Sequence, residues 1–79
     1  MTASRDGQTY LAIEDDNGGH CGDLIVDGAV WRQPVGIAAR ISPGVHEIDC
    51  GTLADYRSAN AIQFDVPAGV VFYFDYWGP

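Results

Sequence analysis

The stretch Leu24-Ile25-Val26-Asp27-Gly28-Ala29-Val30-Trp31-Arg32 decides the fold class. Two runs of β-forming residues flank an Asp-Gly pair, and such a pair readily adopts the positive φ angles of a two-residue hairpin turn. The stretch therefore predicts two antiparallel strands joined by a tight turn at Asp27 and Gly28.

The segment before this hairpin has the alternation of a half-buried strand over residues 8–14. Its two predicted faces carry Thr9, Leu11 and Ile13 on one side and Tyr10, Ala12 and Glu14 on the other. Residues 15–23 then form an acidic, glycine-rich loop. We expect residues 1–7 to be a flexible N-terminus.

Turn signals divide the rest of the chain into further short strands. Apolar residues alternate over 35–41, and the Ser42-Pro43-Gly44 sequence is typical of a type II turn before a strand over 45–50. A second such turn, Pro67-Ala68-Gly69, separates strands over 61–66 and 70–77, which we expect to pair as a hairpin. Residues 51–60 are the one segment compatible with a helical turn.

These elements predict one all-β domain over residues 1–79, a small antiparallel β-sandwich or open barrel of six to seven short strands. A lone hairpin would be only marginally stable, so the strands must share a core. The predicted core residues are Leu11, Ile13, Leu24, Val26, Val30, Ile37, Ile41, Ile48, Ile62, Phe64, Phe72 and Phe74.

Three segments resemble the PEGA-type and related prealbumin-like modules of bacterial envelope proteins. They are Val-Asp-Gly at 26–28, Ile-Ser-Pro-Gly-Val-His-Glu-Ile at 41–48 and Phe-Asp-Val-Pro-Ala-Gly-Val-Val-Phe-Tyr-Phe at 64–74. The resemblance spans residues 24–76 and implies a β-sandwich with a structural or adhesive role. The sequence lacks the secretory signal or lipid-attachment cysteine usual in those proteins, so we expect a cytoplasmic location in a bacterial host, or an exported one if the native gene carries a signal sequence.

The charge balance argues against direct nucleic-acid binding, and the lack of a long apolar stretch rules out a transmembrane segment. Eleven acidic residues face four basic ones, giving a net charge of −7, and all four basic residues are arginines. Affinity for nucleic acid comes mainly from Lys and Arg that neutralise phosphates. No apolar stretch approaches the roughly 18 residues that a membrane span needs.

The two cysteines, Cys21 and Cys50, allow two interpretations. One disulfide between them would form in an oxidising compartment, whereas free, buried thiols are usual in the cytosol. The absence of a signal peptide favours free thiols. Zinc binding by both cysteines with His20 and His46 is disfavoured, because side chains four positions apart on a strand lie about 13 Å apart.

No cofactor, metal site or catalytic site is expected from the motifs. The loop acids from Asp15 onward do not follow the EF-hand pattern, because Val26 stands where its final Glu belongs. The sequence contains none of the hydrolase, dinucleotide-binding or metalloprotease motifs, and so small a domain rarely encloses an active site. We therefore expect that the protein is not an enzyme.

The remaining signal is an acidic, aromatic surface. The last strand concentrates aromatic residues on both faces, which indicates either a strand covered on both sides or a docking patch of Tyr73, Trp77 and Trp31. Asp65 and Asp75 would lie beside this patch if the last two strands form a hairpin. Further acids would extend it, namely Asp15, Asp16, Asp23 and Asp27.

In size, acidity and lack of catalytic motifs the chain resembles small phage-encoded inhibitors such as anti-CRISPR proteins. This resemblance implies a stand-alone binding protein, monomeric or dimeric through an edge strand, that occludes a basic surface of a nucleic-acid-handling protein. The alternative is a structural or adhesive envelope module of the PEGA-like kind.

Overall fold

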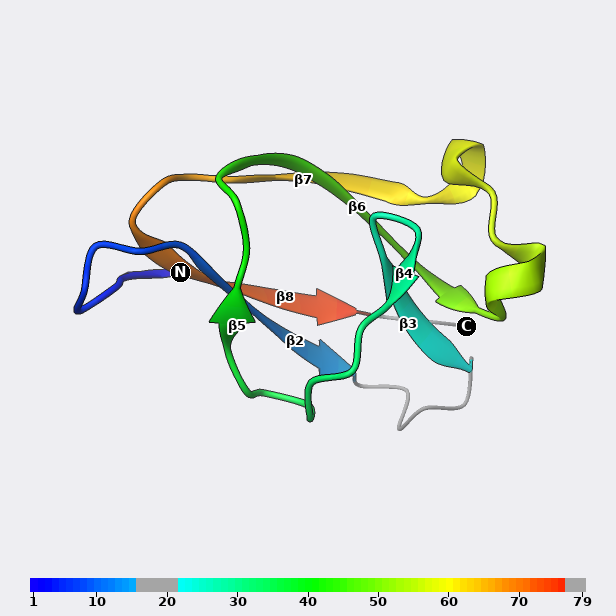
Figure 1. The fold of residues 1–79 in the computed structure, drawn as a ribbon, viewed down its shortest axis with the longest axis horizontal. Coiled ribbons are helices and arrows are strands. Elements are labelled where there is room, and N and C mark those ends of the chain that lie inside the picture. Colours follow the sequence, from blue (N-terminus) through cyan, green and yellow to red (C-terminus); the bar gives the residue numbers. More distant parts are fainter. Residues whose placement is uncertain (16–21, 77–79) are drawn as a thin grey trace.

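The structure, a computed structural model, describes residues 1–15 and 22–76, apart from the side chain of Asp15. Within these residues the chain forms eight strands and two 3-10 helices (Figure 1). The strands are β1 (Thr2–Ala3), β2 (Tyr10–Asp15), β3 (Asp23–Val26), β4 (Ala29–Val30), β5 (Ala39–Arg40), β6 (Gly44–Gly51), β7 (Ile62–Val66) and β8 (Val70–Tyr76). The 3-10 helices are η1 (Leu53–Asp55) and η2 (Ser58–Asn60). The predicted all-β class is confirmed.

The strands form two four-stranded sheets that enclose one core. Sheet A has the order β1-β8-β2-β5, and sheet B has the order β4-β3-β6-β7. Sheet A is mixed, because β2 and β8 run parallel with Leu11 opposite Phe72 and Ile13 opposite Phe74. Parallel neighbours need a long connection, and here the whole of sheet B lies between them along the chain.

The hairpin predicted from the Asp-Gly pair is confirmed. Asp27 has a φ of 52° and Gly28 a φ of 82°, as a type I′ turn requires. The flanking strands β3 and β4 pair antiparallel, with Ile25 opposite Val30. Local turn chemistry therefore determines this element.

The predicted hairpin between the last two strands is wrong. β7 pairs with β6 in sheet B, whereas β8 pairs with β1 and β2 in sheet A. The turn at Pro67–Gly69 therefore carries the chain from one sheet to the other. The reason lies in the core, where the Phe64 ring lies 5.7 Å from Phe72 and 4.9 Å from Phe74 between ring centroids. The two strands bury these rings by facing each other.

The strand predicted over 35–41 is reduced to Ala39–Arg40. Val35 and Ile37 are 57% and 53% exposed, so they contribute nothing to the core. Gly36 adopts a φ of 77°, which breaks the extended backbone, and its N–H donates to the carbonyl of Ile13 at 2.9 Å. The segment thus runs beside β2 without forming a regular strand there.

The observed core draws on both sheets. Its buried members are Leu11, Ile13, Val26, Ile48, Phe64, Val66 and Tyr76, with Leu24, Trp31, Ile41, Cys50, Val70, Phe72 and Phe74 packed against them. Ile62, expected in the core, is 50% exposed because it lies at the start of the edge strand β7. Val66 and Tyr76 belong to the core but were not among the predicted core residues. Tyrosine is usually only partly buried, so its sequence position alone does not indicate burial.

The N-terminus and the connector between β6 and β7 complete the fold. Thr2 and Ala3 pair with Val71 and Val70 of β8. The connector contains η1 and η2, as expected of residues 51–60, and Thr52 caps η1 by accepting from the N–H of Asp55. Among the described residues, no helix has the length and apolar character needed to cross a membrane.

Candidate functional site

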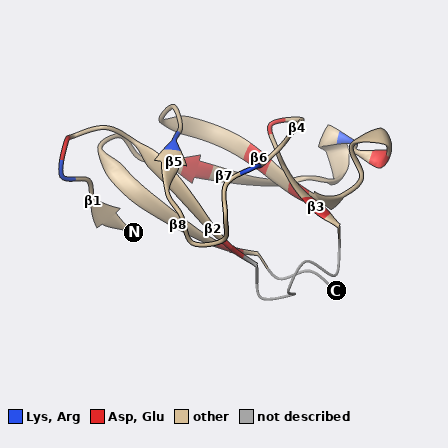
Figure 2. Ribbon diagram, turned by 60° about the horizontal axis from the view of Figure 1, so that its bottom comes forward, with Lys and Arg blue, Asp and Glu red and all other residues tan. Residues whose placement is uncertain are grey.

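The face of sheet B that points away from the core carries a set of carboxylates. Strand pairing places Ile25 opposite Asp49, Val45 opposite Asp65 and Glu47 opposite Gln63, all on this outer face. The face therefore carries four acids, the exposed Asp23 and Asp65 and the half-buried Glu47 and Asp49, and we call it the acidic face. The strands of sheet B contain no Lys or Arg, and red segments on β3, β6 and β7 follow this arrangement in Figure 2.

The connector after β6 anchors one of these carboxylates. The Tyr56 hydroxyl donates to Oε2 of Glu47 at 2.5 Å, and the Ser58 hydroxyl donates to Oε1 at 2.9 Å. The hydrogen bond to the Glu47 carboxylate, followed by burial and nearby negative charges, raises the pKa of Tyr56 to about 12. Glu47 is thus fixed in place, and Asp23 and Asp65 remain exposed.

A second polar cluster lies at the β3–β4 turn and the start of β6. His46 is 8% exposed, and its Nδ1 lies 2.6 Å from Oδ2 of Asp27. Its Nε2 lies 2.6 Å from the carbonyl oxygen of Ser42. The other carboxylate oxygen of Asp27 accepts from the backbone N–H of Glu47 at 2.9 Å. One imidazole therefore joins three segments of the chain.

Burial acts against a charged His46 ring and is the largest single influence on its pKa. The hydrogen bonds to Asp27 and Ser42, with the negative charges of Asp27 and Asp65, outweigh burial and raise the pKa of His46 above its ordinary 6.5. This raised pKa favours the imidazolium form in the folded protein.

Ser42, His46 and Asp27 are the residue types of a nucleophilic triad, but their hydrogen bonds differ from those of a triad. The Ser42 hydroxyl is 3.5 Å from Nε2, farther than the carbonyl of the same residue. A serine nucleophile needs an Nε2 lone pair to take its proton. Because Nε2 donates to the carbonyl instead, the cluster as arranged is a structural link between segments.

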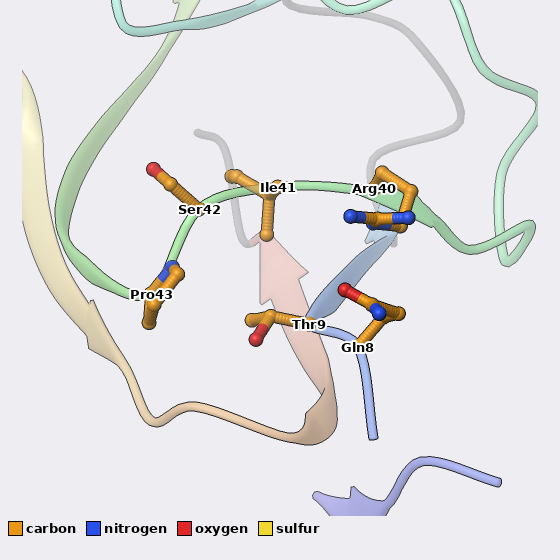
Figure 3. A pocket seen from close by; sticks show the side chains of 6 residues that line it. All are labelled: Gln8, Thr9, Arg40, Ile41, Ser42 and Pro43. Atoms are coloured by element: carbon orange, nitrogen blue, oxygen red, sulfur yellow. The ribbon is translucent and has the colours of Figure 1, made fainter. Parts of the chain in front are cut away.

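A hollow adjoins this cluster, with a volume of about 370 Å³. Figure 3 shows Arg40 and Gln8 on one side of it, with Ile41, Ser42 and Pro43 on a single strand-to-strand connection and Thr9 below them. The Thr9 hydroxyl accepts from the N–H of Gly69 at 3.0 Å, so it ties the floor of the hollow to the β7–β8 turn. Arg40 supplies the cationic group of this wall.

The predicted docking patch does not form as expected. Asp65 lies on the outer face of sheet B, whereas Tyr73 and Asp75 lie on the outer face of sheet A. The separation follows from the split of β7 and β8 between the sheets. Tyr73 is 51% exposed, and β8 lies inside sheet A between β1 and β2.

The other residues predicted to form this docking patch also lie apart from one another. Trp31 packs against the core, and its indole N–H is buried with no hydrogen-bond partner among the described residues. Asp27 is engaged by His46, and Asp23 belongs to the acidic face. Trp77, Asp16 and the side chain of Asp15 lie outside what the structure describes. Sequence reasoning missed the roles of Ser42 and His46, because the contact between His46 and Asp27 joins residues 19 positions apart and has no local signal.

Cys50 is disulfide-bonded, in contrast to the preference for free thiols drawn from the sequence. Its strand neighbour across the ladder is Leu24, and Gly22 packs against the backbone of Gly51. The backbone next to Cys21 in sequence is therefore beside Cys50. Cys21 lies outside the described residues, so its pairing with Cys50 stays a prediction. Within the described ranges, no group of three or more His, Cys, Asp or Glu side chains could hold a metal ion.

Comparisons with known proteins found no match to this chain. No protein-family model matches the sequence, and neither a curated protein nor a solved structure matches the chain.

Proposed function

We propose that the protein is a non-catalytic binding protein that inhibits a nucleic-acid-handling partner by covering a basic surface with its acidic face. The observation that carries the proposal is the presence of Asp23, Glu47, Asp49 and Asp65 on one face of a sheet whose strands contain no Lys or Arg. The proposal keeps the occlusion mechanism expected from the sequence and moves the contact surface from β8 to sheet B.

The regular spacing of a sheet suits this role. Side chains two residues apart on a strand are about 6.7 Å apart, and neighbouring strands about 4.8 Å. Such a rigid array of negative charge complements a groove lined with Arg or Lys and competes with its polyanionic ligand. Charge complementarity of this kind speeds association and rejects acidic partners.

An apolar residue stands within the same face. Val45 is 66% exposed and lies directly opposite Asp65. Interfaces combine a small apolar centre with a charged rim, and Val45 supplies the former here. The connector adds no net charge beside the face, because Asp55 and Arg57 offset each other.

The test compares two double charge reversals. Asp23→Lys with Asp65→Lys changes the acidic face, and Glu14→Lys with Asp75→Lys makes the same change in net charge on the outer face of sheet A. The probe is an immobilised Arg-rich peptide, and a basic nucleic-acid-binding protein loaded with labelled duplex DNA reports displacement. We expect the first pair to weaken binding by about 10- to 100-fold and to abolish displacement, with the second pair much less affected.

Salt dependence provides the second readout. Exposed charge pairs are screened as ionic strength rises, so wild-type binding should weaken in high salt and the acidic-face variant should lose most of this dependence. Equal weakening by both double variants would mean that only net charge matters. That result would remove the acidic face as a defined contact surface.

The disulfide of Cys50 favours a second candidate, an exported structural or adhesive module of the PEGA-like kind. Disulfides persist mainly in oxidising compartments such as the periplasm and the cell surface. Fractionation of cells that express the native gene, with alkylation of free thiols before lysis, tests this candidate. A periplasmic or surface protein without free thiols supports it, and a cytosolic protein with two free thiols contradicts it.

A further inference from the structure

Both ring nitrogens of His46 face hydrogen-bond acceptors. Nδ1 lies 2.6 Å from a carboxylate oxygen of Asp27, and Nε2 lies 2.6 Å from the Ser42 carbonyl oxygen. Neither oxygen carries a proton to donate, so each contact requires an N–H on the ring. A neutral imidazole has only one N–H. The observed arrangement therefore requires the doubly protonated ring.

We infer that His46 is a proton-operated clamp that holds the Ser42–Gly44 turn against the β3–β4 hairpin, and that loss of its proton releases this turn. The ring is 8% exposed, so water cannot readily replace the lost contact. This inference concerns a conformational switch and does not depend on the proposed function.

The groups that surround the ring favour its charged form. Asp27 approaches from the β3–β4 turn, and Asp65 acts on it from β7. Phe64, also on β7, lies 6.0 Å away between ring centroids, and it packs in turn on Phe72 and Phe74 of sheet A. Glu47, the neighbour on β6, points to the opposite face, where Tyr56 and Ser58 bind it.

The contact to Ser42 is the one that breaks. A carboxylate accepts hydrogen bonds more strongly than a neutral carbonyl, so the remaining proton stays on Nδ1 beside Asp27. The Nε2 lone pair then faces the Ser42 oxygen, and the two repel. The backbone contacts that flank the turn are the Ile41 N–H, which donates to the Thr9 carbonyl at 3.1 Å, and the pairing of Gly44 with Val66 of β7. Ser42 and Pro43 are exposed, so nothing packed above them prevents movement.

Release of the turn would also alter the hollow beside it. Ser42 and Pro43 form one wall of this 370 Å³ space, opposite Gln8 and Arg40 (Figure 3). The hollow has this wall only while His46 holds Ser42. The shape of the surface near Arg40 is therefore coupled to the protonation of a buried residue on the other side of the turn.

The test follows the side-chain nitrogens of His46 by NMR across its titration, together with the hydrogen-exchange protection factors of Ile41 and Gly44. Below the transition both nitrogens should have imidazolium shifts. Above it, the Nδ1–H tautomer should appear and protection at Ile41 and Gly44 should fall by about 10- to 100-fold, with Leu11 and Ile13 of β2 unchanged. Protection factors remove the intrinsic pH dependence of exchange.

Three variants complete the test. Asp27→Asn should move the transition to lower pH, and Ser42→Ala should leave it in place because the carbonyl remains. His20→Gln assigns the NMR signals by removing those of the other histidine. A neutral ring in the acidic range, or protection that stays constant through the His46 transition, would overturn the clamp. So would a transition that Asp27→Asn leaves unmoved.

Discussion

Asp27 illustrates how one side chain can serve both a turn and a distant contact. Its φ of 52° fits the first central position of the hairpin turn, which Asp tolerates better than most residues. Its backbone N–H donates to the Glu47 carbonyl, and its carboxylate accepts from the Glu47 N–H, both at 2.9 Å. The same carboxylate holds His46. The turn is therefore bonded to β6 by backbone and side chain together.

The stability of the protein should decrease as pH rises through the pKa of His46. Because this pKa is raised in the folded state, the stabilisation is fully present below the unfolded value of 6.5 and is lost above the folded value. The free energy of unfolding should therefore be smaller at mildly alkaline pH than at mildly acidic pH. Urea unfolding at a series of pH values measures it.

The matched variant for this profile is Asp27→Asn, which keeps the turn and removes the negative charge. It should lower the free energy of unfolding mainly below pH 6.5, where the imidazolium is present. A stability that is constant between mildly acidic and mildly alkaline pH in the wild type would contradict the role assigned to His46.

Gly22 and Gly44 offer a matched pair that separates backbone strain from a steric clash. Their φ angles are nearly equal, 112° and 115°, but a Cβ on Gly22 would lie 2.9 Å from the Gly51 carbonyl oxygen, whereas one on Gly44 meets nothing within 4 Å. Gly44→Ala should cost about 1–3 kcal/mol from strain alone. Gly22→Ala should cost about 1–3 kcal/mol more. Equal unfolding free energies of the two variants would mean that the strands separate easily at Gly51.

At the scale of single residues, the turn at Asp27 could be predicted from the sequence, but the hydrogen bonds of His46 could not. The turn depends on two adjacent residues, so its signal is local and complete. His46 binds partners 4 and 19 positions away, and these meet only once the β3–β6 register is set. Pairing Val26 with Ile48 places Asp27 beside the start of β6. Nothing in the residue types alone indicates this.

At the scale of elements, the connector between β6 and β7 shows how a short irregular segment is held on a sheet. Its two 3-10 turns contain no buried residue, so apolar packing contributes little to their position. Polar contacts hold it instead. Tyr56 and Ser58 both donate to Glu47, and Arg57 donates to the carbonyls of Ala54 and Tyr56. The Glu47 carboxylate is thus the main attachment point of the connector.

Glu47→Gln should return the titration of Tyr56 from about 12 toward the ordinary 10.0, because it removes the negative charge that opposes phenolate formation. The raised pKa also means that the contact stabilises the fold below pH 10.0 and that this stabilisation is lost as pH rises toward about 12. Phenolate absorbance reports the titration, and Tyr56→Phe assigns the transition. A Tyr56 transition that is the same in wild type and Glu47→Gln would contradict the contact.

Strand alternation predicted most elements but not how they assemble. The strands predicted from a two-residue period over 8–14, 45–50, 61–66 and 70–77 each contain a strand of the fold. Residues 35–41 have the same period and largely fail, because Gly36 adopts a positive φ and only Ala39 and Arg40 pair with β2. The split of β7 and β8 between sheets depends on ring packing across the core, which has no signature in either strand alone.

At the scale of the whole molecule, charge is distributed unevenly between the two sheets. Sheet B bears the acidic face, whereas Arg40 lies in sheet A, 6.0 Å from the Tyr10 ring centroid. Arg5, Arg32 and Arg57 lie in loops. The acidic face is therefore not neutralised by a basic residue on its own strands. Its position was not predictable from composition, since it requires the register of β3, β6 and β7.

The disulfide of Cys50 should supply a large share of the stability of so small a domain. The sequence contains one other cysteine, Cys21, so an intramolecular bond closes a loop with 28 intervening residues. Closure of such a loop stabilises by about 3–4 kcal/mol in the chain-entropy description. A 79-residue chain has a net stability of only about 4–12 kcal/mol. We therefore expect reductant to lower the unfolding midpoint strongly.

Urea unfolding with and without reductant measures this effect, and the Cys21→Ser, Cys50→Ser double variant is its control. The variant should match the reduced wild type and should not respond to reductant. Mass measurement without reductant separates the intramolecular bond from one between two copies, which would appear as a reducible dimer. Identical midpoints for the oxidised and reduced wild type would contradict this contribution, because they would mean that the cross-link restricts a segment that is already compact in the unfolded chain.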